Sequence, residues 1–349
     1  MLAADRIPLN DPNKASSNGE AVAWKRIIAS AEPFLDLVAQ RLAQQIGEFE
    51  RDIAAYAEYA LTNQGKQLRP ALVAMSGGAT GTLTDSHALA AVIVEMVHLA
   101  TLVHDDVMDG AQIRRGRPTL AAMWGSEISV LLGDCLFANA LKLAAGFPTT
   151  EICRAVSMAT NTVCSGEILQ TQRRRNFELS RSEYFKFIQM KTGELFALSC
   201  DLGACLSGAT ASHRQALRQF GMSLGTAYQV YDDCLDLFGR EAMAGKSLGT
   251  DLAKGKLTLP IILAIERGTD EEKRLIERLV RNWDPVFFPQ IAGVLQQREC
   301  FEGAKSAVVG HLDEARNQLR ALPESASRKA LFDMTDYLEF QTEALGAEA

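Results

Sequence analysis

Residues 88–109 read ALAAVIVEMVHLATLVHDDVMD, an apolar run that ends in three aspartates. Alanine and leucine favour helix, and the apolar residues recur at the three- and four-residue spacing of a helix. Glu95 and His98 interrupt the run, so a buried core helix explains it better than a membrane span does. This stretch therefore predicts a long helix in the interior of a helical protein.

Other segments show the same helical pattern. Residues 34–49 read FLDLVAQRLAQQIGEF, residues 128–146 read ISVLLGDCLFANALKLAAG, and none of the ten prolines falls between Pro148 and Pro260. Few stretches alternate apolar and polar residues as a half-buried strand does. The sequence predicts an all-α fold class, with roughly ten or more helices.

Clusters of Gly, Pro, Asn and Ser indicate where these helices end. The predicted breaks lie at 62–70, 76–82, 146–150, 239–250 and 283–289. Residues 1–20 are polar and are expected to form a mobile tail, whereas no linker divides the rest of the chain. We therefore expect residues 21–349 to form a single all-helical domain.

Composition argues against several classes of function. The net charge of −7 disfavours general binding to nucleic acid or to anionic membranes. The seven cysteines are scattered without a CxxC pair, which is typical of thiols in a reducing compartment. The N-terminus lacks the apolar core of a signal sequence, and no stretch of about 18 apolar residues is present to span a membrane. We expect a cytoplasmic protein.

The acidic ending of residues 88–109 recurs in residues 231–239, which read YDDCLDLFG. Each residue of a helix turns by about 100°, so positions four and seven apart share a face. In the first stretch this face carries His98, Leu102, Asp105 and Asp109, with Asp106 at its edge. In the second stretch it carries Gln229, Asp236 and either Asp232 or Asp233.

Carboxylates packed this closely repel one another unless a cation joins them. A single DDxxD sequence can be an exposed turn, but two copies inside apolar helices favour a metal site. Oxygen ligands without clustered cysteine or histidine indicate Mg²⁺, which typically takes one or two carboxylates and completes its shell with water and substrate phosphates.

Basic residues accompany the acidic stretches, mostly near helix ends or in glycine-bearing loops. They are Lys66, Arg69, Arg114, Arg115, Lys191, Lys246 and Lys256. Arginine and lysine beside metal-binding carboxylates suit a diphosphate, because its charge is then shared between the metal and these side chains. The run of arginines at 173–175 is interpreted instead as a solvated surface.

Six motifs in this order resemble the trans-prenyltransferases, the polyprenyl (isoprenyl) diphosphate synthases, and most closely their medium- and long-chain members. The motifs are GKQLRP (65–70), HLATLVHDDVMDGAQIRRGRPT (98–119), GEILQ (166–170), KTGELF (191–196), YQVYDDCLDLFG (228–239) and GKSLGTDLAKGKLTLP (245–260). The resemblance covers the chain from about residue 30 onward. It implies the helical bundle of isoprenoid synthases with a central apolar tunnel, and Mg²⁺-dependent head-to-tail condensation of isopentenyl diphosphate with an allylic diphosphate.

This resemblance also implies roles for individual residues. The catalytic acids are Asp105, Asp106, Asp109, Asp232, Asp233 and Asp236. Of these, Asp105, Asp109, Asp232 and Asp236 bind Mg²⁺, with about three ions present beside substrate. Isopentenyl diphosphate is bound by Lys66, Arg69, His98 and Arg115. The allylic diphosphate is bound by Arg114, Lys191, Thr192, Gln229, Lys246 and Lys256.

The resemblance implies further that the allylic substrate is dimethylallyl, geranyl or farnesyl diphosphate and that the enzyme is a homodimer. No side-chain nucleophile is needed, because metal and basic side chains stabilise the leaving diphosphate while the apolar walls exclude water. The chain departs from the family pattern GGKRxRP at Gln64 and Gln67.

Product length is expected to depend on the two residues that precede the first motif by five and four positions. In the family, short-chain members usually carry an aromatic residue at the first of these. Here the residues are Ala100 and Thr101. We expect a product longer than about 20 carbons, in the range of about 30 to 50. The alternative is that a bulky residue within 128–146 or 150–165 closes the tunnel sooner and gives a geranylgeranyl or farnesyl product.

Three other functions compete with this one. A class I terpene cyclase shares the helical fold, but its second metal site usually follows an Asn/Ser/Glu pattern. A non-catalytic subunit of a heteromeric prenyl synthase tends to lose some carboxylates, whereas this chain keeps all six. A general divalent-metal-binding helical protein would leave the ordered basic residues unexplained.

Overall fold

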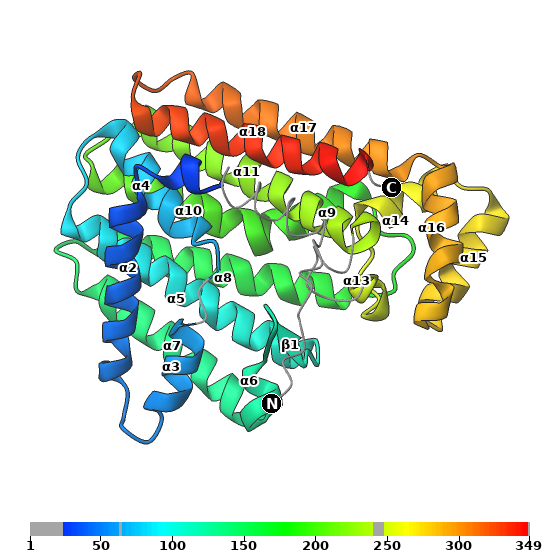
Figure 1. The fold of residues 1–349 in the computed structure, drawn as a ribbon, viewed down its shortest axis with the longest axis horizontal. Helices are drawn as coiled ribbons and strands as arrows, with labels where there is room; N and C mark the ends of the chain where they lie inside the picture. Colours follow the sequence, from blue (N-terminus) through cyan, green and yellow to red (C-terminus); the bar gives the residue numbers. More distant parts are fainter. Residues whose placement is uncertain (1–23, 63–64, 240–247, 348–349) are drawn as a thin grey trace, which may run out of the picture.

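The computed structural model describes residues 24–62, 65–239 and 248–347, and Figure 1 shows their arrangement. The predicted tail at 1–20 and the predicted ligand Lys246 lie outside these ranges. Sixteen α-helices lie wholly within them, which confirms the all-α fold class.

The helices follow one another along the chain in this order: α2 (Glu32–Gln44), η1 (Gln45–Glu48), α3 (Ala54–Thr62), α4 (Leu68–Thr80), α5 (Asp85–Met108), α6 (Leu120–Trp124), α7 (Ser126–Ala145), α8 (Thr150–Gln172), α9 (Arg181–Ile188), η2 (Gln189–Gly193), α10 (Glu194–Leu206), α11 (Ala211–Phe238), α13 (Thr250–Ala253), α14 (Leu259–Arg267), α15 (Asp270–Arg281), η3 (Pro285–Phe287), α16 (Phe288–Gln297), α17 (Cys300–Leu319) and α18 (Ala326–Ala347).

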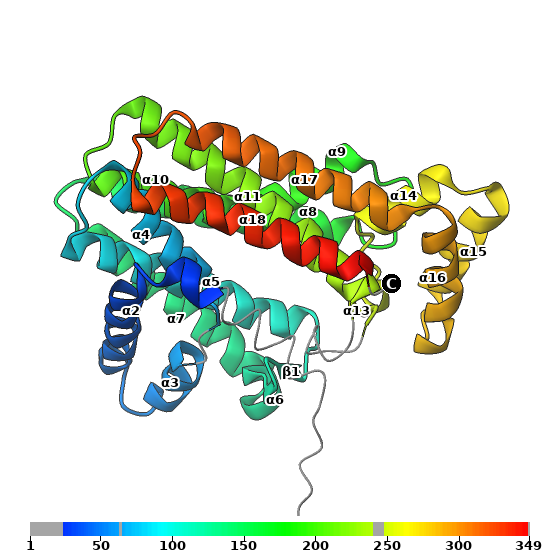
Figure 2. The ribbon, with the colours of Figure 1, turned by 45° about the horizontal axis from the view of Figure 1, so that its top comes forward.

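The interior consists of two apolar clusters. One lies among α10, α11, α14, α17 and α18, and the other among α2, α5, α7 and α8. Helix α10 contributes Phe196 to the first cluster and Leu195 to the second, while α4 contributes Leu72 and Val73 in the same way. These two helices therefore lie between the clusters. Helices α17 and α18 run side by side, along the top of the bundle in Figure 1 and across its front in Figure 2.

Helix α5 is the long helix predicted from residues 88–109. At its start the backbone N–H of Thr84 donates to Nδ1 of His87 at 3.0 Å, and this pair caps the first turn. Contrary to the expectation that no stretch could span a membrane, both α5 and α7 are long and apolar enough to do so by length and composition alone. In α5 the most apolar segment is 72% buried inside the bundle, so it is a core helix as predicted, whereas the corresponding segment of α7 is only 39% buried.

The predicted breaks at 146–150 and 283–289 are confirmed, because α7 ends at Ala145 and α15 at Arg281. The predicted break at 76–82 is confirmed only at its end, since α4 continues to Thr80 and the chain leaves the helix at its C-cap residue, Gly81. Gly77 and Gly78 lie inside α4, where a Cβ atom would meet His87 and Ser327 respectively. A Cβ atom on Gly203 of α10 would lie 2.4 Å from the carbonyl oxygen of Val73 and 3.0 Å from the nitrogen of Gly77.

A short antiparallel hairpin, absent from the helical prediction, follows α5. It pairs β1 (Ile113–Arg114) with β2 (Arg117–Pro118). Arg115 and Gly116 form its turn with φ values of 51° and 72°, in the left-handed region that hairpin turns require. The hairpin turns Arg114 back to α5, where its Nε donates to Oδ1 of Asp106 at 2.8 Å.

Candidate active site

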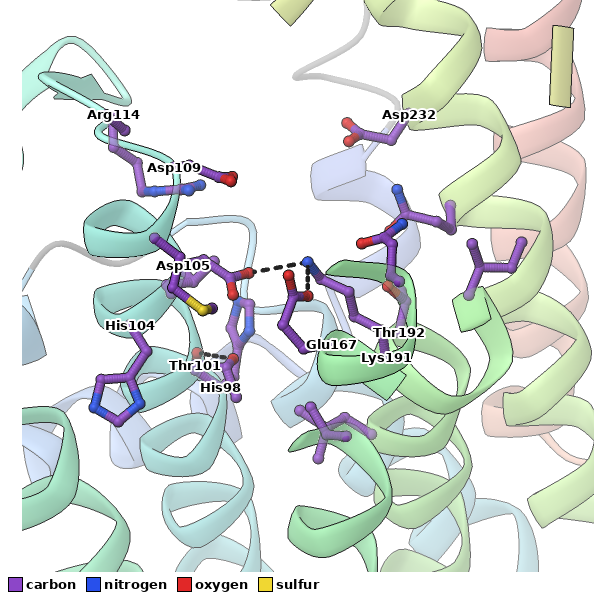
Figure 3. Close-up of a pocket in the computed structure, with 18 of the residues that line it drawn as sticks. His98, Thr101, His104, Asp105, Asp109, Arg114, Glu167, Lys191, Thr192 and Asp232 are labelled. Atoms are coloured by element: carbon purple, nitrogen blue, oxygen red, sulfur yellow. Dashed lines mark hydrogen bonds and ion pairs between the residues drawn. The ribbon is translucent and has the colours of Figure 1, made fainter. Parts of the chain in front are cut away.

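The two acidic stretches face one another across a single pocket. Asp105 and Asp109 lie at the end of α5, and Asp232 lies on α11 on the opposite side (Figure 3). All three line a pocket of about 1200 Å³. The fold thus brings together the two motifs that the sequence predicts to act on one ligand.

Three basic side chains surround Asp109. The Nζ atoms of Lys254 and Lys256 lie 2.9 and 3.1 Å from its Oδ2, and Nη2 of Arg174 lies 3.2 Å from its Oδ1. Burial raises the pKa of Asp109, but the two lysines outweigh burial and lower this pKa to about 2. Asp109 is therefore ionised near neutral pH, and its charge is balanced by the cations around it.

Lys191 joins Asp105 to Glu167. Its Nζ lies 3.4 Å from Oδ2 of Asp105 and contacts the carboxylate of Glu167 (Figure 3). Burial raises the pKa of Asp105, Lys191 lowers it, and Glu167 raises it again. Burial lowers the pKa of Lys191, but the two carboxylates outweigh burial and raise it above its ordinary value. The ammonium group thus stays charged at the centre of the pocket.

The π-helical turn η2 carries Lys191 and lies against α8. A Cβ atom on Gly166 of α8 would lie 2.7 Å from Cβ of Met190 and 3.0 Å from the backbone nitrogen of Lys191. This close approach holds Lys191 next to the side chain of Glu167, the residue that follows Gly166. Single π-turns of this kind occur frequently at functional sites.

Asp233 belongs to a chain of hydrogen bonds in the wall of the pocket. The Tyr184 hydroxyl donates to Oδ2 of Asp233 at 2.6 Å, and Nε2 of Gln229 donates to Oδ1 at 2.9 Å. The Thr192 hydroxyl in turn donates to Oε1 of Gln229 at 2.7 Å. Burial raises the pKa of Asp233 well above its ordinary value. This chain fixes α9, α11 and η2 relative to one another.

Asp236, the last acid of the second stretch, is only 1% exposed. Its Oδ1 accepts hydrogen bonds from the backbone N–H and the hydroxyl of Thr250 at 3.3 and 2.6 Å, and its Oδ2 accepts one from the backbone N–H of Asp251 at 3.1 Å. Asp236 therefore contacts the start of α13, the segment that leads to Lys254 and Lys256.

The residues predicted to bind isopentenyl diphosphate line the same pocket: Lys66, Arg69, His98 and Arg115. Glu95 is buried beside them at 3% exposure. Burial raises the pKa of Glu95, while Arg69 and Arg115 lower it. Burial also lowers the pKa of His98 well below its ordinary value, and the same two arginines lower it further. The imidazole of His98 is therefore neutral near pH 7 and lies in a strongly positive environment.

The two residues predicted to influence product length differ in their access to the pocket. Ala100 is fully buried in the packing of α5, whereas Thr101 lines the pocket and its hydroxyl donates to the carbonyl of His98 at 2.7 Å (Figure 3). Apolar residues also line the pocket, among them Leu102, Phe137, Val163, Ile188 and Leu195.

Several residues of the site were not predicted as ligands. The interpretation of 173–175 as a solvated surface is wrong for Arg174, which is half-buried against Asp109. No local signal identifies this pair, because 65 positions separate the two residues. Lys254 and Glu167 lie inside motifs quoted above, so their neighbours Lys256 and Gly166 could have drawn attention to them.

The donors present suit a hard divalent cation that is shared with a ligand. Asp105, Asp109 and Asp232 supply only oxygen atoms, which Mg²⁺ and Ca²⁺ prefer. Within the described ranges, no three His, Cys, Asp or Glu side chains converge to hold a metal by themselves. A bound cation would therefore complete its shell with water and the phosphate oxygens of a ligand in the pocket.

Comparisons with known proteins agree with this site. The sequence model of the polyprenyl synthetase family matches residues 50–285. The chain is 33% identical over 81% of its length to all-trans-nonaprenyl-diphosphate synthase (geranyl-diphosphate specific) from Rhodobacter capsulatus, with 87% of that protein covered. It is also 31% identical to geranylgeranyl diphosphate synthase from Methanosarcina mazei, over 81% of this chain and 87% of that protein.

A solved structure shows the same fold. The polyprenyl synthase from Caulobacter crescentus, complexed with calcium and isoprenyl diphosphate, has a TM-score of 0.86 and 33% identity, over 90% of this chain and 97% of that one. Enzymes of the family depend on a divalent metal, as the oxygen donors of this pocket also indicate. The chain therefore belongs to the polyprenyl synthetase family and is a prenyltransferase with polyprenyl diphosphate synthase activity.

Proposed function

We propose that the protein condenses isopentenyl diphosphate head-to-tail with an allylic diphosphate, namely dimethylallyl, geranyl or farnesyl diphosphate, in a reaction that depends on Mg²⁺. One observation carries this proposal: Asp105 and Asp109 face Asp232 across a pocket that basic side chains line on several sides. Such a pocket suits two diphosphates, one of them shared with metal.

The allylic diphosphate would bind between the two acidic stretches. Bound Mg²⁺ would supply electrostatic stabilisation of the charge that develops on the leaving diphosphate. Asp105, Asp109 and Asp232 would hold the metal. The remaining diphosphate oxygens would be bound by Arg114, Lys191, Thr192, Gln229 and Lys256, and by Lys246, which lies outside the described residues.

Isopentenyl diphosphate would bind to Lys66, Arg69 and Arg115, with neutral His98 as a hydrogen-bonding partner. Its double bond would then attack the allylic carbon as diphosphate leaves. The apolar residues that line the pocket would keep water from the allylic cation and receive the growing chain.

For the product we propose a length above about 20 carbons, in the range of about 30 to 50. The small side chains of Ala100 and Thr101 and the pocket volume of about 1200 Å³ support this length. The relatives named above bear names of both nonaprenyl and geranylgeranyl synthases, so their likeness alone does not choose between lengths.

We further propose that residues 21–349 form one domain and that the enzyme works as a cytoplasmic homodimer. Apolar side chains gather on the exposed faces of α7 and α8, including Val130, Leu131, Met158 and Ile168. An exposed apolar face of this kind favours contact with a second copy over contact with water. The resemblance to the family supports the same arrangement.

The proposed reaction is tested by incubating purified protein with Mg²⁺, labelled isopentenyl diphosphate and each allylic primer in turn, then sizing the dephosphorylated products. We expect linear products of about 30 to 50 carbons and no condensation after chelation of the metal. Asp232→Asn is the matched inactive control, with kcat reduced by about 10²- to 10³-fold. Absence of condensation with every primer would contradict the proposal and favour a non-catalytic subunit, and a cyclised hydrocarbon would favour a terpene cyclase.

A further inference from the structure

The second acidic stretch divides between two environments. Asp232 faces the pocket (Figure 3), whereas the carboxylate of Asp236 is buried and both of its oxygens accept hydrogen bonds from Thr250 and Asp251. The backbone carbonyl of Asp236 also accepts a hydrogen bond from the N–H of Gly249 at 2.8 Å. Three consecutive residues, 249–251, are thus attached to one aspartate at the end of α11.

These attachments continue to the first acidic stretch through residues 249–256, which we call the lysine loop. The carbonyl of Asp251 accepts hydrogen bonds from the backbone N–H groups of Lys254 and Lys256 at 3.2 and 2.9 Å. The side chains of both lysines then bind Oδ2 of Asp109. A continuous series of short contacts therefore leads from Asp236 on α11 to Asp109 on α5.

We propose that Asp236 is a positioning residue that fixes the lysine loop, so that Lys254 and Lys256 point at Asp109 and at the diphosphate bound there. This inference rests on the proposed function, because that diphosphate is the ligand the lysines would share with Asp109. In this role Asp236 connects the two acidic stretches, instead of binding Mg²⁺ as the sequence predicted.

Only a carboxylate satisfies all the donors at this position. Oδ1 accepts from Thr250 while Oδ2 accepts from Asp251, so two acceptor atoms are required. An asparagine offers a single acceptor oxygen, and its NH₂ group would meet one of these N–H groups. Leaving a buried N–H without an acceptor destabilises the fold by more than the hydrogen bond itself contributes.

Four variants separate positioning from metal binding. Asp236→Asn removes one acceptor, and Thr250→Val removes the hydroxyl donor with little change of shape. Thr250→Ser restores that donor and serves as the conservative rescue. Asp232→Asn changes the acid that faces the pocket. Thr250→Val keeps the test valid if the buried Asp236→Asn variant folds poorly.

For Asp236→Asn and Thr250→Val we expect faster amide hydrogen exchange in residues 250–256. We also expect a KM for the allylic diphosphate raised by roughly 3- to 10-fold, with the KM for isopentenyl diphosphate and kcat within about 2-fold of wild type. Thr250→Ser should behave as wild type in both measurements. The Mg²⁺ concentration for half-maximal rate should stay within about 2-fold in Asp236→Asn and rise by about 10-fold or more in Asp232→Asn.

The inference is overturned if Asp236→Asn leaves exchange in the lysine loop unchanged and shifts the Mg²⁺ requirement as Asp232→Asn does, because Asp236 would then be a metal ligand. Hydrogen exchange is measured without substrate. If the wild type fails to condense any primer, the proposed function fails, while faster exchange in both variants still supports the positioning role and unchanged exchange still refutes it.

Discussion

A single substitution at Thr101 is expected to change the length of the product. It lines the pocket one position after Ala100, which is fully buried. A phenylalanine at 101 would fill the space next to the apolar wall, so Thr101→Phe should shorten the product to about 20 carbons or fewer. Thr101→Val, which keeps the shape, should leave the product length unchanged. Product length is measured by chromatography after dephosphorylation.

Ala100→Tyr should also shorten the product, but with a second effect. Because Ala100 has no exposed surface, a ring there must displace its neighbours and should lower the free energy of unfolding by about 1–3 kcal/mol. An unchanged product in both variants would contradict the role of this position. The closure of the tunnel would then have to lie farther along the wall, for example at Phe137.

His98 should make stability depend on pH. Burial, then Arg69 and Arg115, lower the pKa of His98 well below 6.5. A base with a depressed pKa in the folded state stabilises the fold above its ordinary pKa, and this stability is lost as pH falls, because the unfolded chain takes up the proton first. Between about pH 6.5 and 5, the free energy of unfolding should fall by at most about 1.4 kcal/mol per pH unit on this account.

Denaturant unfolding at a series of pH values checks this expectation, with His98→Gln as the comparison. The variant cannot take up the proton, so its stability should fall less steeply over the same pH range. Parallel pH profiles for the two proteins would show that His98 does not carry this dependence.

Gly225 of α11, at the contact with α10, is expected to affect both the stability of the protein and its activity. A Cβ atom on Gly225 would lie 2.9 Å from both Cα of Gly193 and Cβ of Phe196, and neither atom can move without its backbone. Gly225→Ala should therefore separate these helices and lower the free energy of unfolding by about 1–3 kcal/mol. Activity should fall too, since the Thr192–Gln229 hydrogen bond lies across the same contact.

Gly293 on α16 provides the matched control, because a Cβ atom there would meet nothing within 4 Å. Gly293→Ala should raise stability by about 0.5–1 kcal/mol, since alanine is the better helix former. Both variants are compared by thermal unfolding and by condensation rate. A Gly225→Ala protein as stable as wild type would show that this contact is looser than described.

Sequence reasoning predicted the helices well because apolar periodicity reports directly which face is buried. It placed the start of the break at 76–82 too early, since Gly77 and Gly78 lie inside α4, where they make room for His87 and for Ser327 far along the chain. The hairpin at 113–118 was missed because strands of two residues show no periodicity. The pairing of Arg174 with Asp109 was missed for the same reason as the glycines, since it exists only once distant segments meet.

The site residues were easier to predict than their individual roles. Residue type and order identified the aspartates, and the fold brings Asp105, Asp109 and Asp232 to one pocket. Asp236 and Asp232 differ in their surroundings, because Thr250 and Asp251 of the lysine loop donate to the Asp236 carboxylate while Asp232 faces the pocket. Helical spacing alone cannot assign such a difference, because both side chains project from the same helix.

At the scale of the whole molecule, the exposed face of α7 and α8 is expected to hold a second copy. We expect a dimer in sedimentation velocity or light scattering. Leu131 is 60% exposed near the start of α7, so Leu131→Glu would bury a charge in the contact and should dissociate the dimer. Phe340→Glu on α18 alters an equally exposed apolar residue, 62% exposed, outside this face and should leave the dimer intact. A wild-type monomer, or a dimer that tolerates Leu131→Glu, would contradict this assignment.

Dimer formation should also affect catalysis, because the apolar face and the pocket share residues. Val130 and Ile168 are exposed on α7 and α8, and both line the pocket. A second copy packed there would cover this side of the pocket and exclude water from the growing chain. The monomeric Leu131→Glu protein should therefore lose kcat and release shorter products, while its thermal stability, measured in parallel, stays high enough to exclude unfolding as the cause. A folded monomer that makes full-length product at the wild-type rate would show that one chain closes the tunnel alone.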